Sequence, residues 1–351
     1  MKHFNLSFLV TAICLGVSAW WGYSNAGIAG AVTAISIAAI LGIMEVSLSF
    51  DNAVVNASVL KHWDIFWQTM FLTVGILVAV FGMRLVFPLV IVAQAADLGM
   101  MEVWNLALNN PKAFSTHLTN HHAEVAAFGG IFLLLVFLNF LFDDEKELHW
   151  LGKFEETLAS YSHAGSIPVL VALAVVLGSV GMVGESKKLV VLTAGIWGIL
   201  VYVGVDFISN LLEKEEEGDT NVAEIVKRGS IGGFLYLEVL DASFSFDGVI
   251  GAFAITNDVV IIMLGLAIGA MFVRSMTVYL VRQGTLEEFV FLEHGAHYAI
   301  GILALIMFAS MQHHIPEIFT GLVGVGFILA SLWSSVIYKR KAALSACPPS
   351  C

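Results

Sequence analysis

The chain has 351 residues, of which 58% are hydrophobic and only 13% are charged. A soluble core of this size does not need so apolar a composition, which instead indicates a polytopic, all-α membrane protein. The formal net charge of −12, without a basic patch, argues against nucleic acid as a partner.

About ten apolar segments are long enough to span a bilayer, each of roughly twenty residues. Their limits are 4–22, 28–58, 65–92, 125–142, 167–183, 189–212, 231–256, 259–281, 296–312 and 316–338. The first ends in Trp20-Trp21 without a small-residue cleavage site, so we expect an uncleaved span. The second is too long for a simple span, and we expect it to break near Asp51.

The basic residues predict the orientation of these spans. If the N-terminus is cytoplasmic, most Lys and Arg residues fall in inner loops, and only Lys112, Lys187 and Lys188 fall outside. Both termini are then cytoplasmic. The acidic loops 143–156 and 213–224 are expected to be solvated surfaces, and residues 341–351 a flexible tail.

Two seven-residue segments inside spans nearly repeat each other. Residues 47–53 read Ser-Leu-Ser-Phe-Asp-Asn-Ala, and residues 243–249 read Ser-Phe-Ser-Phe-Asp-Gly-Val. The offset between the copies is five spans, an odd number, so the copies have opposite orientations, as in many transporters. We expect one membrane domain over 1–340, with repeat A at 1–185 and repeat B at 188–340.

Aligning the copies pairs Asp51 with Asp247, and the two spans together carry a set of acids that is expensive in hydrocarbon. On a regular helix Glu45, Ser49 and Asn52 share one face, and Glu238, Asp241 and Ser245 share another. Asp51 and Asp247 lie off those faces. We therefore expect both motif helices to be broken or irregular near the bilayer midplane, helped in the second copy by Gly248.

Carboxylate, amide and hydroxyl oxygens are the ligands that hard divalent cations such as Mn²⁺, Mg²⁺ and Ca²⁺ take. The predicted ligands are Glu45, Asp51, Asn52, Glu238, Asp241 and Asp247, with Ser49, Ser245, Arg84 and Arg274 in support. Glu238 is either a supporting ligand or a proton carrier, and the two arginines are counter-ions that orient the acids. The alternative is a purely structural role, in which these acids pair with the arginines and hold the repeats together.

Other candidate sites are weaker. His117, His121, His122 and Glu124 have a spacing that can bind a transition metal, although such loops are common without one. Glu293, His294 and His297 enter a span from the inner side and could lie on an ion path. Cys14, Cys347 and Cys351 have no metal or disulfide spacing. No phosphate-binding loop is present, so we do not expect an ATP-driven pump. We also expect neither an enzyme nor a bound cofactor.

The paired motifs resemble those of the TerC superfamily of bacterial membrane proteins. That family's first pattern is similar to Glu45-Val-Ser-Leu-Ser-Phe-Asp51-Asn52, and its second to the segment from Asp241 to Ala252. Ala242, Gly248 and Gly251 depart from the second pattern but leave the acids in place. Phe128-Gly129-Gly130 and the Glu-His-Gly segment at 293–295 look more like a related branch.

The resemblance implies a protein of the bacterial inner membrane that handles metal ions. Several TerC-like branches are linked to manganese export, and others to tellurite and stress resistance with cytoplasmic partner proteins. We therefore expect a transporter that exports a divalent cation, with Mn²⁺ as the first choice of substrate, by alternating access. The alternative is a membrane anchor of a stress-resistance complex whose acidic loops bind partners. An intramembrane aspartyl hydrolase is disfavoured because its G-x-G-D pattern is absent.

Overall fold

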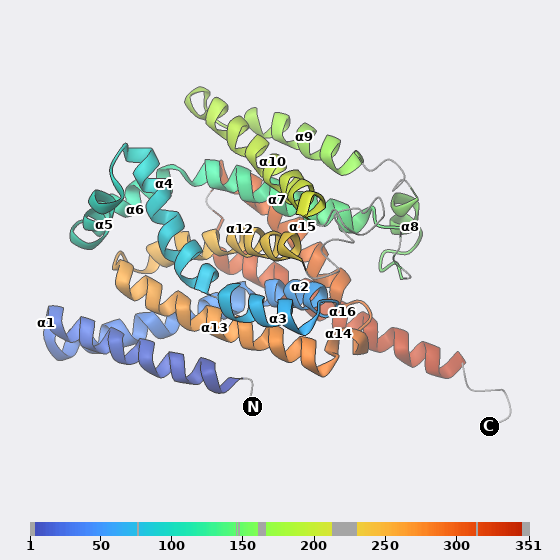
Figure 1. Ribbon diagram of the computed structural model, residues 1–351, viewed down its shortest axis with the longest axis horizontal. Helices are drawn as coiled ribbons and strands as arrows, with labels where there is room; N and C mark the ends of the chain where they lie inside the picture. The colour runs from blue at the N-terminus through green and yellow to red at the C-terminus, as the bar shows by residue number, and fades with distance from the viewer. Residues whose placement is uncertain are drawn as a thin grey trace.

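The structure is a computed structural model that describes residues 4–75, 77–144, 146, 148–160, 166–212, 230–313 and 315–345. Every element within these ranges is a helix, as the sequence predicts (Figure 1). The acidic loop 213–224 lies outside the described residues, and so does the end of the tail, 346–351.

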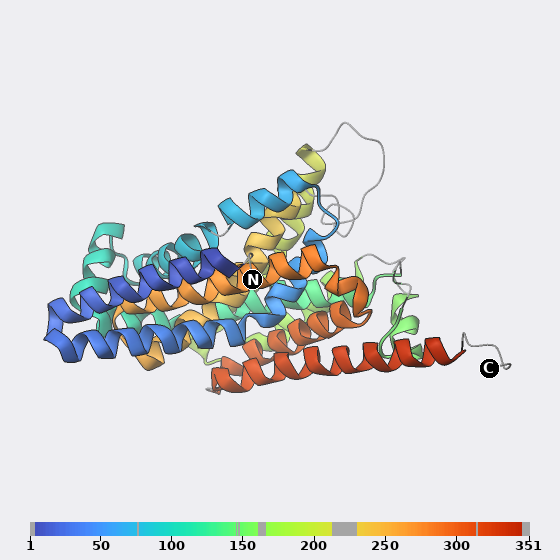
Figure 2. The ribbon, with the colours of Figure 1, turned by 90° about the horizontal axis from the view of Figure 1, so that it is seen from below.

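The chain begins with a helical hairpin. Helix α1 (Asn5–Leu48) turns back on itself at Ala26 and Gly27, and Gly27 has a φ of 61°, which suits a residue without a side chain. The two arms touch at Gly22 and Gly30, where a Cβ on either glycine would collide with the carbonyl oxygen of the other. Figure 2 shows the arms side by side along α13 (Val259–Gln283), the helix on which α1 packs.

The remaining elements follow in the order of Figure 1. They are α2 (Phe50–Leu60), α3 (Ile65–Met70), the π-helical stretches η2 (Phe71–Gly75) and η3 (Val78–Val86), α4 (Phe87–Ala96), α5 (Met100–Asn109), α6 (Pro111–Asn120), α7 (His122–Leu141), α8 (Lys153–Ala159), α9 (Ile167–Val180), the short 3₁₀ turn η4 (Glu185–Lys187), α10 (Lys188–Leu212), α12 (Ile231–Ile255), α13, α14 (Thr285–Glu288), α15 (Leu292–Ser310) and α16 (Glu317–Ser345).

Helices α7 and α15 form the centre of the bundle. α7 packs against both α10 and α15, and Phe132 and Leu133 of α7 and Ile300 of α15 are fully buried. By contrast α1 and α16 lie at the periphery and expose large apolar side chains such as Trp20 and Trp333. An apolar exterior around a packed centre is what a bilayer requires, so the protein is a multi-pass membrane protein.

Seven helices among the described residues are long and apolar enough to cross a membrane. One of the seven is α1, which folds into two arms. The acid-bearing α12 is not among them, and α9 is shorter. The predicted number of ten spans, the inverted repeat and the division into repeats A and B therefore stay predictions.

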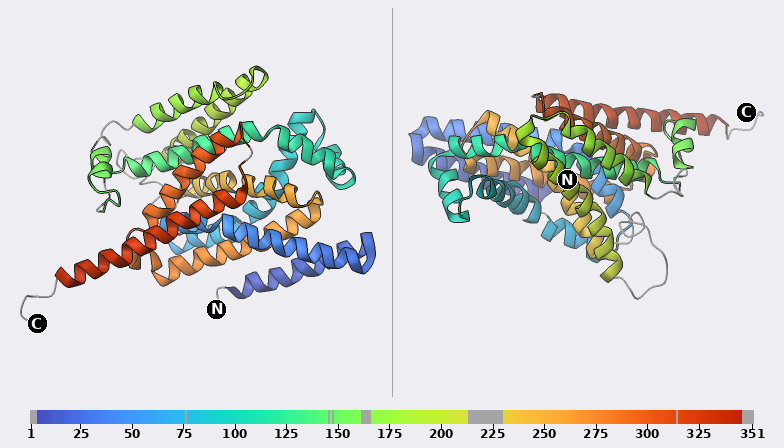
Figure 3. Two further views of the ribbon diagram at one scale, coloured as in Figure 1. Left: turned by 180° about the vertical axis from the view of Figure 1, so that it is seen from behind. Right: turned by 90° about the horizontal axis from the view of Figure 1, so that it is seen from above.

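The bundle has two ends that differ in what they carry. The turn of α1, α5 and α6 lie together at one end, which we call the α5–α6 end (Figure 1). Helix α8 and the last turns of α16 lie at the opposite end, the α8 end, as the reverse view in Figure 3 also shows. The basic-residue pattern predicts that the α8 end is cytoplasmic.

Candidate functional site

The first sequence motif breaks its helix, as expected, and the break falls at Ser49. This residue has φ −104° and ψ 17°, and it separates α1 from α2. The Ser49 hydroxyl donates to Glu45 Oε1 at 3.0 Å. Asp51 lies in the first turn of α2, where its Oδ1 accepts from the Asn52 N–H at 2.9 Å. All four side chains are buried, so the break places polar groups inside the bundle.

Arg84 pairs with Glu45 inside the bundle. The guanidinium comes from η3, where its Nη1 donates to the carbonyl oxygen of Ala79 at 2.9 Å and its Nη2 donates to Glu45 Oε1. The two side chains are only 4% and 1% exposed. A buried ion pair of this kind contributes little net stability while intact, but losing one partner leaves an uncompensated charge.

Glu45 and Asp51 face a small cavity of about 30 Å³, which we call the Glu45–Asp51 cavity. Two glycines make room for its acids. A Cβ on Gly248 of α12 would lie 2.7 Å from Glu45 Oε2, and a Cβ on Gly324 of α16 would lie 3.2 Å from Asp51 Oδ2. Gly248 therefore acts by leaving space for a carboxylate, and not by breaking its own helix.

The second motif lies on an unbroken helix. α12 runs continuously from Ile231 to Ile255, so the expected irregularity of this copy is wrong. The irregular backbone occurs instead in the neighbouring span, whose π-helical stretches η2 and η3 carry Gly75 and Arg84. π-Helical segments are frequent at functional sites because they move side chains out of the regular register.

Glu238 and Asp241 face a second cavity of about 40 Å³, the Glu238–Asp241 cavity. Both Glu238 carboxylate oxygens and Asp241 Oδ2 are buried without a hydrogen-bond partner. A Cβ on Gly75 would collide with Glu238 Oε1. Arg274 lines the same cavity, but its Nε donates to the carbonyl oxygen of Leu72 at 2.6 Å.

The two cavities are neighbours without merging. Among the described residues they share no lining side chain. The sequence predicts one pooled site, whereas the structure places the acids in two separate cavities. Asn52 links them, because its Nδ2 donates to Asp241 Oδ1 at 2.6 Å while its backbone holds Asp51. Ser245, which also lies on α12, has a buried hydroxyl without a hydrogen-bond partner. Asp247 lies in α12, and its side chain is outside the description.

No group of three or more His, Cys, Asp or Glu side chains in the described part of the chain is arranged to hold a metal ion. Each cavity instead offers two carboxylates together with neutral oxygens, from Ser49 in the first and Asn56 in the second. At the α5–α6 end, His121 Nδ1 and Glu124 Oε1 lie 2.8 Å apart, and His117 sits one helix earlier, on α6.

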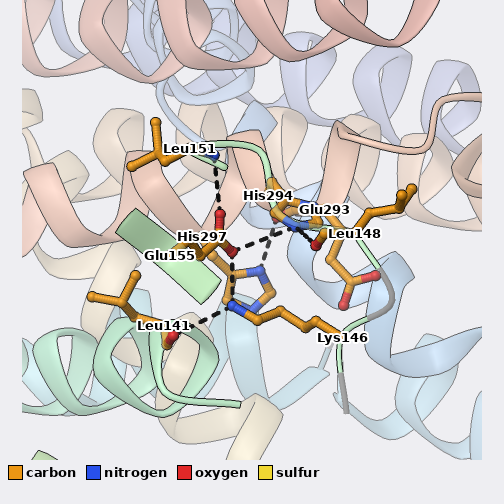
Figure 4. A network of polar contacts seen from close by, with 8 residues as sticks. All are labelled: Leu141, Lys146, Leu148, Leu151, Glu155, Glu293, His294 and His297. Atoms are coloured by element: carbon orange, nitrogen blue, oxygen red, sulfur yellow. Dashed lines mark hydrogen bonds and ion pairs between the residues drawn. The ribbon is translucent and has the colours of Figure 1, made fainter. Parts of the chain in front are cut away.

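A polar network lies at the α8 end (Figure 4). Glu155 accepts from Lys146 Nζ at 2.7 Å and from the Leu151 N–H at 3.2 Å, and His294 of α15 donates from Nε2 to the carbonyl oxygen of Leu148 at 2.8 Å. Glu155 is fully buried, so the expectation that loop 143–156 is uniformly solvated is wrong at this residue. An acid becomes internal here because a lysine and a backbone donor surround it.

The charge of Glu155 stabilises this network, and we expect the effect of replacing Glu155 to depend on pH. Burial opposes the charged form, but hydrogen bonds from Lys146 and the Leu151 N–H outweigh it and hold the pKa of Glu155 below its ordinary value of 4.5. Its contribution is therefore complete above that ordinary pKa and is lost as the pH falls through the lower folded-state value.

Glu155→Gln should lower the free energy of unfolding at pH 7 by about 1.5–3 kcal/mol, the worth of hydrogen bonds to a charged group. The difference from the wild type should shrink as the pH is lowered below 4.5. Thermal unfolding in detergent over a pH series measures both effects. Glu156→Gln, a change at an exposed neighbour, is the control. Equal destabilisation at every pH would contradict the assignment.

A family model described as "Protein of unknown function (DUF475)" matches residues 50–342. The chain belongs to this family. The match includes Asp51, Asn52 and the whole second motif, and it begins after Glu45. An uncharacterized membrane protein, YceF, of Bacillus subtilis (strain 168) is 33% identical over 107 residues, which cover 29% of this chain and 40% of the relative. The chain thus matches well under half of that relative's length. No solved structure matches.

Several residues of this DUF475 protein reach the cavities without having been predicted. Thr320 and Gly324 come from α16, Gly75 from η2 and Asn56 from α2. Thr320 and Gly324 lie in a largely apolar span whose one acid, Glu317, stands at its first residue, so nothing in the sequence points to these two positions. Asn56 had a signal that could have been used, because it lies one helical turn after Asn52 on the same face.

Proposed function

We propose that this protein is a secondary transporter that exports a divalent metal cation, with Mn²⁺ as the substrate. The observation that carries the proposal is the pair of buried cavities, each with two carboxylates. In the second cavity both carboxylate oxygens of Glu238 and Oδ2 of Asp241 lack hydrogen-bond partners. The resemblance of both motifs to the TerC superfamily supports the same class of substrate.

The charge balance favours a positive ligand. Four carboxylates line the two cavities, while Arg84 is paired with Glu45 and Arg274 donates to a backbone carbonyl. A buried carboxylate without a partner carries a desolvation penalty of several kcal/mol. A proton or a cation that enters the cavity removes that penalty, so neutralisation and binding are coupled.

Cavity size favours an ion that gives up its water. One water molecule needs about 10–15 Å³ of such space. Cavities of about 30 and 40 Å³ therefore hold a bare ion and a few waters at most. Mg²⁺ dehydrates reluctantly and keeps several waters, whereas Mn²⁺ accepts carboxylate, carbonyl and amide oxygens. We infer that a small, dehydrated Mn²⁺ fits better than a hydrated Mg²⁺.

In the proposed mechanism, Asp51 and Glu45 bind the cation in the first cavity. The hydrogen bond from Asn52 to Asp241 then couples the occupancy of the first cavity to the position of Asp241 in the second. The break at Ser49 allows α2 to move relative to α1. Repeats A and B then alternate the access of the site between the cytoplasm and the outside of the bacterial inner membrane, with the α8 end cytoplasmic.

The test is cation flux in proteoliposomes. Purified protein is reconstituted, and Mn²⁺ movement is followed with a trapped fluorescent indicator, with Mg²⁺, Ca²⁺ and Zn²⁺ as competitors and protein-free liposomes as the blank. Saturable Mn²⁺ flux above the blank is expected. Flux equal to the blank for every cation would reject transport and leave the membrane-anchor alternative.

Replacing Glu238 should distinguish cation binding from coupling of transport to protons. Because both its oxygens lack partners, its charge must be neutralised in each half of the cycle, and a proton serves when the cation is absent. Glu238→Gln should therefore retain Mn²⁺–Mn²⁺ exchange but lose acceleration by an imposed pH gradient. Exchange of radioactive Mn²⁺ and net gradient-driven flux measure the two. Net flux that still responds to the gradient would remove Glu238 as the proton carrier.

A further inference from the structure

A larger cavity, of about 390 Å³, opens at the α5–α6 end. We call it the vestibule. Its walls come from α6, the start of α7, the end of α12, the end of α15 and the start of α16, and they include the polar side chains of Ser115, Thr119, Ser310 and Gln312. Its size and polar lining suit hydrated solute, in contrast to the two small acidic cavities.

Two residues, Ile306 and Thr320, line both the vestibule and the Glu45–Asp51 cavity. They are the residues common to the two described linings, so one layer of side chains separates the vestibule from the acids. We call this layer the neck.

Helix geometry explains the continuity. Leu303, Ile306 and Ser310 share one face of α15. Along this face Leu303 lines the acidic cavity, Ile306 lies at the neck and Ser310 lines the vestibule. On α16, Thr320 precedes Gly324 by one turn, about 5.4 Å along the helix. Gly324 is the residue whose missing side chain leaves room for Asp51. The two helices thus line one route.

The opposite end carries ion pairs instead of a described cavity lining shared with the acids. Lys61, which follows α2, forms an ion pair with Glu293 of α15 at 3.2 Å, and Lys146 pairs with Glu155 near the same end of α15. Among the described residues, the Glu45–Asp51 cavity shares lining with the vestibule and with neither of these pairs.

The vestibule lacks the acids of the two small cavities. Its described lining contains no carboxylate, and Lys187 contributes a positive charge beside the side chains of His122 and His313. A cation that reaches it from the acids meets water, hydroxyl groups and imidazoles instead of a second anionic site. Such a lining favours release over capture.

We propose that the vestibule is the exit route for the transported cation and that Thr320 and Ile306 form its outer gate. This inference rests on the proposed function for the identity of the solute, but the route itself can be tested without any flux. Thr320 supplies a hydroxyl oxygen to a cation stripped of water, while Ile306 closes the neck against solvent.

The first experiment maps access by cysteine labelling. In a background with Cys14, Cys347 and Cys351 replaced by serine, Thr320→Cys and Ile306→Cys are treated with a membrane-impermeant, positively charged thiol reagent. We expect both to react in intact cells and not in inverted vesicles. Thr119→Cys, on the vestibule wall, is the reactive control, and the fully buried Ser331→Cys on α16 is the unreactive one. Labelling of Thr320→Cys from the cytoplasmic side alone, or its absence beside a labelled Thr119→Cys, would overturn the route.

The second experiment blocks the neck. Thr320→Phe should reduce Mn²⁺ flux by about tenfold or more, equivalent to about 1.4 kcal/mol on the barrier. Leu329→Phe, at an exposed position of the same helix, should leave flux unchanged. Size-exclusion elution and melting temperature check that both variants fold. Unchanged flux in folded Thr320→Phe would reject the gate. If labelling follows expectation while the wild type carries no cation, the proposed function fails and the route stands.

Discussion

Arg84→Met should strongly destabilise the protein. Removing the guanidinium leaves Glu45 buried in the bundle with only the Ser49 hydroxyl as a described donor. Breaking a buried pair in this way costs about 3–5 kcal/mol. The midpoint of thermal unfolding in detergent, followed by the fluorescence of the native tryptophans, should fall by many degrees.

The double variant Arg84→Met with Glu45→Gln is the matched control for this effect. It removes both charges, while Gln keeps an oxygen that accepts from Ser49. Replacing both members of a buried pair is often close to neutral, so the double variant should regain most of the stability lost in Arg84→Met. A double variant as unstable as the single one would show that Arg84 stabilises the fold through packing and its bond to Ala79 instead.

Asp51→Asn should abolish Mn²⁺ flux while leaving the fold intact. Asn is nearly isosteric and retains an oxygen that accepts from the Asn52 N–H, so the start of α2 survives. The cavity, however, loses one of its two carboxylates, and the remaining Glu45 is already paired with Arg84. The loss should exceed the roughly 10–100-fold that supporting residues around metal sites cost.

Asp64→Asn provides the matched control for that experiment. Asp64 caps α3 by accepting from the Trp67 N–H at 2.8 Å, it is exposed, and Asn caps helices about as well. Its flux should equal that of the wild type. The measurement is initial Mn²⁺ flux per reconstituted molecule, with elution volume as the check on folding. Wild-type flux in a folded Asp51→Asn protein would remove the Glu45–Asp51 cavity from the pathway.

The embedded acids were the part of this site that local sequence could locate. An aspartate within an apolar run is costly enough to stand out, and the repeated Ser-x-Ser-Phe-Asp pattern predicted both the buried acids and the break at Ser49. The partner of Glu45 was also within reach, because Arg84 was one of two basic residues inside spans.

What could not be predicted depends on contacts that exist only in the folded chain. Gly324 and Gly75 act through a missing side chain, so their effect exists only where Asp51 and Glu238 approach them. Helix propensity alone suggests a break at Gly248, but α12 is continuous there. The absent side chain of Gly248 instead leaves room for the Glu45 carboxylate. The acidic loop around Glu155 predicts a solvated side chain, and only the fold brings Lys146 and Leu151 to it.

The contrast between the interrupted α1–α2 helix and the continuous α12 has a consequence for any transport cycle. If the repeats were equivalent, the inward-facing and outward-facing conformations would be mirror images, each obtained by exchanging the shapes of the two halves. Here the helix is interrupted at the first motif and continuous through the second. If the chain transports with two such halves, α2 would move while α12 stays fixed, and the cavities that open to the two sides of the membrane would differ in depth and width. An inhibitor shaped for one side would have no counterpart on the other.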